Sequence, residues 1–67
     1  MYYLIAKNNT WTNEAMTTAQ IEAKGCKVEE TRVSFADKKM TLNGTACGFL
    51  FTSQAAQVAH LAHLGLI

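Results

Sequence analysis

The sequence predicts a small single α+β domain over residues 1–67, in which two helices lie on one face of an antiparallel-dominated sheet. The first observation is the composition. The 67 residues are 49% hydrophobic and 16% charged and lack proline, so they have enough apolar surface for one ordered core and room for only one. The second observation is that two segments begin with a helix-capping residue and end with a glycine, as helices often do. The third observation is that turn-forming residues divide the rest of the chain into short segments that favour β-strands. The predicted element order is β-α-β-β-(β)-α, where the bracketed strand depends on how one turn is interpreted.

Residues 2 to 7, with the sequence YYLIAK, are expected to form the first strand. Aromatic and β-branched side chains favour extended structure, and Asn8 and Asn9 mark a turn directly after them. Almost every residue of this segment is apolar, so both of its faces suit burial. We therefore expect the strand to lie in the centre of the sheet.

The first helix is predicted from its two ends. Thr17 and Gln20 have the spacing of a capping box, in which each side chain bonds to the backbone of the other residue. Gly25 suits the left-handed position that follows the last turn of a helix, and an apolar residue comes next. The start of the helix has two alternatives, a longer helix from Asn13 or a short one from Thr18.

A second strand is expected over residues 27–36. Val33 and Phe35 fall on one face of an extended chain and alternate with polar residues, which predicts an amphipathic strand. The segment Asp37, Lys38 and Lys39 then reads as a polar turn.

A hairpin is expected directly after that turn. Residues 40–42 resume extended structure, and Asn43 and Gly44 both tolerate the positive φ of a type I′ turn. The pair predicts either a further strand over 45–51 or a bulge in a longer strand, and we favour the further strand.

The final helix is predicted to follow the capping pair Thr52 and Ser53 and to end near Leu64, where Gly65 repeats the left-handed role. At about 100° per residue, one side of this helix is mostly alanine and larger apolar residues and should face the core. Its members are Ala55, Val58, Ala59, Leu61 and Ala62. The opposite side then carries Ala56, Gln57, His60, His63 and Leu64.

Two thiols and two imidazoles raise the hypothesis of a structural zinc site. Cys26, Cys47, His60 and His63 are the right ligand types, but zinc sites bring cysteines in on short knuckles, and twenty residues separate these two. The histidines are also expected to point away from the core. We therefore predict no metal and no cofactor, with both cysteines as buried free thiols, and any site made by the two histidines alone would be weak.

Enzymatic chemistry is not indicated. Neither cysteine has a recognisable base and orienting group, the carboxylates form no pair in an apolar setting, and no glycine-rich phosphate loop is present. A chain of this size also has little volume for a deep substrate cleft. We expect a protein that is not an enzyme.

The composition also bears on location and on the kind of partner. The apolar run of residues 2–6 is too short for a signal sequence, no stretch is long enough to span a membrane, and two cysteines are too few for a disulfide framework, so a cytoplasmic location is expected. The net charge is only +1, and the six basic residues are dispersed. Charge therefore does not favour a polyanionic partner.

We predict that the protein acts by binding a larger protein partner, or a second copy of itself as a homodimer. The uncharged segment 45–51 would be a poorly protected sheet edge, and aromatic residues left on an uncovered sheet face would anchor an interface. The residues expected at the interface are Tyr2, Tyr3, Trp11, Lys38, Lys39, His60 and His63.

Small ordered chains of this kind are common among accessory proteins of bacteriophages and mobile elements. We therefore expect a phage or mobile-element protein that inhibits or redirects a host protein complex, defence systems included. The alternative is a small nucleic-acid-associated regulator with a basic patch made by Lys24, Lys27, Lys38 and Lys39.

Overall fold

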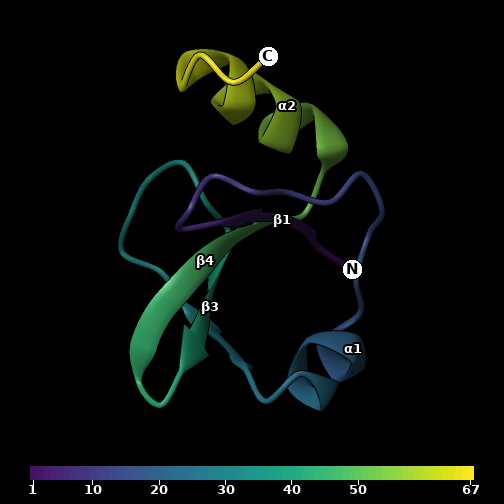
Figure 1. Ribbon diagram of the computed structural model, residues 1–67, viewed down its shortest axis with the longest axis vertical. Helices are drawn as coiled ribbons and strands as arrows, with labels where there is room; N and C mark the ends of the chain where they lie inside the picture. Colours follow the sequence, from purple (N-terminus) through teal and green to yellow (C-terminus); the bar gives the residue numbers. More distant parts are fainter.

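The computed structural model describes residues 1–67 and contains four strands and two helices. The strands are β1 (Tyr3–Ala6), β2 (Lys27–Glu30), β3 (Lys38–Leu42) and β4 (Thr45–Phe51), and the helices are α1 (Thr18–Ala23) and α2 (Gln54–His63). All strand pairs are antiparallel. The predicted α+β class and element order are confirmed, and the bracketed strand is present as β4 (Figure 1).

The strands are arranged in the order β1-β4-β3-β2, which makes β4 central and β1 an edge strand. The prediction that the first strand is central is therefore wrong. Its outer edge is instead covered by the segment that follows it, because Tyr2 and Met16 exchange two backbone hydrogen bonds of 2.7 Å and Ile5 forms a bridge with Trp11. Because the following segment pairs with this edge, β1 can be apolar on both faces without exposing an unprotected strand edge.

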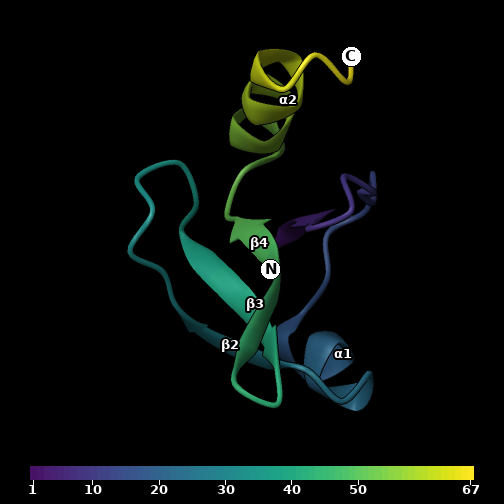
Figure 2. The ribbon, with the colours of Figure 1, turned by 60° about the vertical axis from the view of Figure 1, so that its left-hand side comes forward.

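The two helices cover opposite faces of the sheet, which corrects the expectation that both lie on one face. Successive residues of a strand point to opposite faces, and the core divides accordingly into two clusters. The α2-side cluster consists of Ile5, Phe51 and Leu61, and the α1-side cluster consists of Ile21, Met40 and Leu50. The sheet lies between the two helices in both ribbon views (Figures 1 and 2). Because β1 and β4 are apolar on both faces, each face needs its own helix.

Helix α1 is short because its capping box fixes the first turn. The Thr17 hydroxyl accepts a hydrogen bond from the backbone N–H of Gln20 at 3.1 Å, and the Gln20 side chain accepts one from the Thr17 backbone N–H at 2.8 Å. The helix therefore begins at Thr18, and the alternative of a longer helix from Asn13 is excluded. Gly25 takes the expected left-handed conformation after the helix, with φ of 86°.

The middle of the chain differs from the expected pattern. The strand predicted over 27–36 ends at Glu30, and Lys38 and Lys39 belong to β3 rather than to a turn. The intervening loop is held by contacts with residues far along the chain, chiefly those of Phe35 and Asp37 described below. The predicted type I′ turn is confirmed, since φ is 53° at Asn43 and 81° at Gly44.

Helix α2 has the predicted caps but a different buried side. Ser53 accepts a hydrogen bond from the Ala56 N–H at 3.1 Å, and Gly65 is left-handed with φ of 76°. The buried residues are Gln57 and Leu61, whereas Val58, expected in the core, is 43% exposed. The helix is turned this way because the Gln57 amide bonds to backbone carbonyls. Neither helix has the length and apolar character needed to cross a membrane.

Candidate functional site

An aromatic ring and an imidazole stack face to face beside α2. The ring of Phe35 lies nearly parallel to that of His60, with centroids 4.1 Å apart and an interplanar angle of 5°. Beneath this pair, Phe49 meets Phe35 edge-on at 5.2 Å and Phe51 lies 6.3 Å from it. We call this arrangement the Phe35–His60 stack. Although it is packed on one side, Phe35 keeps 41% of its surface exposed.

The second histidine extends the stack along the helix. The rings of His60 and His63 are 5.9 Å apart, as expected for residues about one turn apart on a helix. His60 is half-buried and His63 is exposed. The prediction that both histidines lie away from the core therefore holds for His63, while His60 contacts Phe51 of the α2-side cluster.

A hollow of about 350 Å³ lies next to the Phe35–His60 stack, and we call it the α2-side hollow. Its volume is at the small end of the range for ligand pockets. Apolar side chains and the two imidazoles form most of its walls, and one lysine and one asparagine complete them. The lining residues are Ile5, Ala6, Lys7, Asn9, Phe35, Phe49, His60, His63 and Leu64.

The polar groups of the α2-side hollow are suited to an anion. No aspartate or glutamate lines it. The Lys7 ammonium is a permanent donor, and each imidazole has at least one N–H to donate in either protonation state. An apolar group with an adjacent carboxylate therefore matches the walls of this hollow.

The cysteines and the histidines lie on opposite faces of the sheet. Cys26 and Cys47 pack against the α1-side cluster, whereas His60 contacts the α2-side cluster. No group of three or more His, Cys, Asp or Glu side chains lies close enough together to hold a metal ion. The Cys₂His₂ set that the composition suggested is not assembled.

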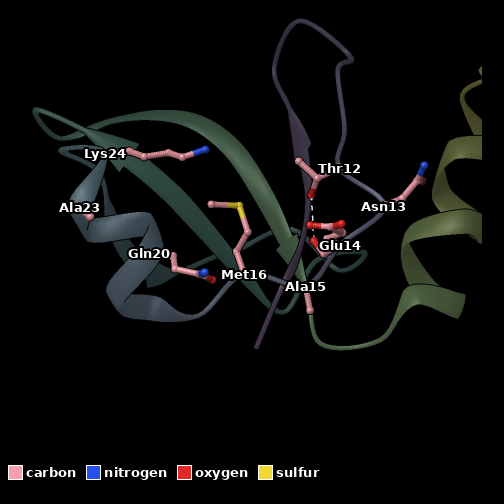
Figure 3. A pocket seen from close by; sticks show the side chains of 8 residues that line it. All are labelled: Thr12, Asn13, Glu14, Ala15, Met16, Gln20, Ala23 and Lys24. Atoms are coloured by element: carbon pink, nitrogen blue, oxygen red, sulfur yellow. Dashed lines mark hydrogen bonds between the residues drawn. The ribbon is translucent and has the colours of Figure 1, made fainter.

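A second, more open hollow of about 640 Å³ lies between α1 and the segment before it (Figure 3). The Thr12 hydroxyl donates to the Glu14 carbonyl at 3.1 Å at one end, and Lys24 lies at the other. Its walls combine small side chains with both signs of charge and contain no aromatic ring. The lining residues are Thr12, Asn13, Glu14, Ala15, Met16, Gln20, Ala23 and Lys24. This hollow favours no particular ligand.

The lysines expected to form a basic patch do not share one surface. Lys38 and Lys39 are consecutive residues of β3, so their side chains point to opposite faces of the sheet. Lys38 forms an ion pair with Glu30, and this hydrogen bond raises the pKa of the Lys38 ammonium. Lys39 lies opposite Glu29 in the strand register. Acidic residues of β2 thus accompany both lysines.

The aromatic residues predicted at an interface are also dispersed. Tyr2 and Tyr3 are half-buried on opposite faces, against the α1-side and α2-side clusters respectively. Trp11 is half-buried against the α2-side cluster. The aromatic side chain that is exposed is instead Phe35, which the sequence analysis placed on a strand face and not at the interface. Its position among polar residues, in the run RVSFADKK, is the sequence feature that could have indicated its exposure.

No family model, curated protein or solved structure matches the chain. The function proposed below therefore depends on the geometry of the molecule.

Proposed function

We propose that this protein is a non-enzymatic binding module that holds an acidic segment of a larger protein partner in the α2-side hollow. The observation that carries this proposal is the exposed ring of Phe35, stacked on His60 at the rim of the hollow. Aromatic side chains dominate the energetics of protein interfaces when a partner covers them. Here the ring is already held in place on one side by three other rings, so little side-chain freedom is lost when the other side is covered.

The apolar surface continues beyond the stack. Leu64 lines the hollow and is 42% exposed, and Val33, in the same loop as Phe35, is 37% exposed. A partner that inserts an aromatic or branched apolar side chain would cover this surface. A carboxylate next to that side chain in the partner's sequence would reach Lys7 or the imidazoles.

The support for a non-enzymatic role is the content of the hollow. Its two histidines have no serine, threonine, cysteine or carboxylate beside them among the lining residues. A general base without a nucleophile or an orienting group lacks the parts of a catalytic site. The cysteines lie on the opposite face of the sheet.

We further propose that the protein acts in the cytoplasm as a bacteriophage or mobile-element accessory protein that inhibits or redirects a host protein complex. A second copy of the chain is a competing occupant, although the reason first given for a homodimer is weakened because the uncharged strand β4 is central and not an edge. The open edge, β2, carries Lys27, Glu29 and Glu30, and charged residues on an edge oppose strand pairing.

The nucleic-acid alternative has less support from the geometry, because Lys38 and Lys39 point to opposite faces of the sheet and each lies beside a glutamate of β2. It predicts binding to DNA or RNA that falls steeply as salt is added. Binding through the Phe35–His60 stack would change much less with salt.

The proposal is tested with peptides selected from a random library on the immobilised protein. We expect the selected peptides to place an aromatic or branched apolar residue next to aspartate or glutamate. Phe35→Ala should weaken their binding about tenfold or more, the effect of losing an anchor of at least about 1.4 kcal/mol. Lys7→Glu should also weaken it.

The matched control is Val58→Ala, because Val58 is a similarly exposed apolar residue that does not line the hollow. This variant should bind as the unaltered protein does. Equal affinity of Phe35→Ala for the peptides, with its folding verified by circular dichroism, would contradict the proposal. Sedimentation of the protein alone across a wide concentration range shows whether it self-associates, and the same measurement on Phe35→Ala shows whether the α2-side hollow is the contact.

A further inference from the structure

The two cysteines meet on the face of the sheet opposite the α2-side hollow. Their Sγ atoms are 3.9 Å apart although the residues lie far apart in the sequence. The side chains of Met16 and Met40 belong to the same α1-side cluster, so four sulfur-containing residues pack there together. This cluster takes no part in the function proposed above.

The fold brings the thiols together over strand β3. Cys26 follows Gly25 and leads directly into β2, on one side of β3. Cys47 lies in β4, on the other side, at the bulge where the register shifts between Met40 and Thr41. The Cys47 thiol donates a hydrogen bond to the Met40 carbonyl at 3.3 Å, which fixes its direction.

This arrangement is unsuited to a disulfide. Strand β3 lies between the two backbones, and two strand spacings of about 4.8 Å separate strands that flank a third. Disulfide-linked residues usually have Cα atoms about 4.4–6.8 Å apart. A disulfide would therefore require the two backbones to approach each other across β3.

The same separation suits two thiolates that share one metal ion. Sulfurs bound at about 2.3 Å lie about 3.8 Å apart at a tetrahedral angle and about 4.6 Å apart in line with the ion. The observed 3.9 Å lies at the tetrahedral end of this interval, so two thiolates in line with one ion would have to move apart by about 0.7 Å, which rotation of the two side chains can supply. Both thiols are half-buried, and Cys26 lines an open hollow of about 470 Å³.

We propose that Cys26 and Cys47 form a binding site for one Cu(I) ion. Thiolate ligands select soft ions such as Cu(I). A structural zinc ion requires four ligands. No histidine, aspartate or glutamate lies close enough to the two thiols to serve as a third ligand. Binding converts two thiols to thiolates and releases two protons to solvent, so affinity falls as pH falls.

The test is a competition in the absence of oxygen, in which the reduced protein removes Cu(I) from the coloured chelator bicinchoninate. The expected result is one Cu(I) per chain. Cys26→Ser and Cys47→Ser should each weaken binding at least about 100-fold, since loss even of a group that only supports a metal ligand costs 10–100-fold. The matched control is the double variant His60→Ala with His63→Ala, which removes the other metal-binding side chains and should bind Cu(I) normally. In the corresponding competition with a zinc indicator, the protein should not remove Zn(II) from the indicator.

Several outcomes would overturn this site. They are absence of binding by the unaltered protein, normal binding by either serine variant, loss of binding in the histidine variant, or one Cu(I) for every two chains. If a serine variant fails to fold, the unaltered protein with both thiols blocked by iodoacetamide replaces it. Blocked protein that remains folded and still takes up Cu(I) would equally contradict the proposal.

Discussion

Gln57 is a polar residue that occupies a core position of α2. Its side chain is 1% exposed, and its Nε2 atom donates hydrogen bonds to the Leu4 carbonyl at 2.9 Å and the Thr12 carbonyl at 2.8 Å. One side chain thus ties α2 to strand β1 and to the segment that covers its edge. Backbone carbonyls in such partly buried positions are satisfied by donors of this kind within the protein.

Replacing Gln57 with leucine should therefore destabilise the protein although leucine is apolar and similar in size. The variant removes the two hydrogen bonds that Gln57 donates to the carbonyls of the half-buried residues Leu4 and Thr12, and each such bond contributes about 0.5–1.5 kcal/mol of unfolding free energy. Urea denaturation measures the loss. Gln54→Leu, at an exposed position of the same helix, should change stability by less than about 0.5 kcal/mol. Equal stability of the two variants would mean that Gln57 does not hold the helix in place.

Asp37 fixes the end of the loop before β3. Its carboxylate accepts hydrogen bonds from the Thr52 backbone N–H at 2.8 Å and from the Thr52 hydroxyl at 3.0 Å. The backbone bond, then the hydroxyl bond and the charge of Lys38, lower the pKa of Asp37 below its ordinary value of 3.8.

The lowered pKa has a defined consequence for stability. Because the folded protein holds the carboxylate more strongly than the unfolded chain does, its contribution is complete above the ordinary pKa and is lost as pH falls through the lowered one. Asp37→Asn should therefore be less stable than the unaltered protein at neutral pH, and the difference should shrink as the solution is acidified below pH 3.8. Denaturation midpoints at a series of pH values test this. A constant difference across that series would exclude the proposed role of the charge.

The elements that were predicted correctly are those determined by neighbouring residues. The capping box of Thr17 and Gln20, the turn at Asn43 and Gly44, and the left-handed Gly65 all depend on residues a few positions apart. The loop after β2 is a strand in the sequence prediction but not in the structure, because its conformation depends on contacts with Thr52 and the His60 imidazole. Local alternation of polar and apolar residues contains no information about such distant contacts.

The glycines after the two helices provide a test at this scale. Gly25 and Gly65 have φ of 86° and 76°, and no atom would contact an added Cβ at either position. Alanine at either position should cost about 1 kcal/mol, entirely from the backbone conformation. Gly65→Asn should cost less than Gly65→Ala, because asparagine tolerates this conformation better. Equal costs for asparagine and alanine would indicate a different cause.

Gly48, in the central strand, is required for a different reason. A Cβ there would lie 3.0 Å from Leu4 Cδ1 and 3.2 Å from both the Ile5 carbonyl oxygen and Met40 Cε. The leucine and methionine tips can move, but the carbonyl belongs to the paired strand β1. We expect Gly48→Ala to destabilise by about 1–3 kcal/mol through overpacking, measured as a shift of the urea midpoint. An unchanged midpoint would show that β1 and β4 separate easily.

At the scale of the whole molecule, the sheet divides the protein into two sides with different chemistry. One side carries the Phe35–His60 stack and the α2-side hollow, and the other carries the paired thiols. The sequence identified the histidines and cysteines as residues of interest but could not show that the sheet separates them. It also could not show that Lys7 and Phe35 join the histidines, because these residues come from three different parts of the chain.

The central claim is that the side bearing the Phe35–His60 stack binds the partner. The most direct test is to add a peptide selected on the protein to ¹⁵N-labelled protein and to record which backbone amide signals shift. The account predicts that the largest shifts occur at residues 5–9, in the loop around Phe35 and at residues 60–64. Largest shifts at residues 12–24, or along the β2 edge, would contradict it.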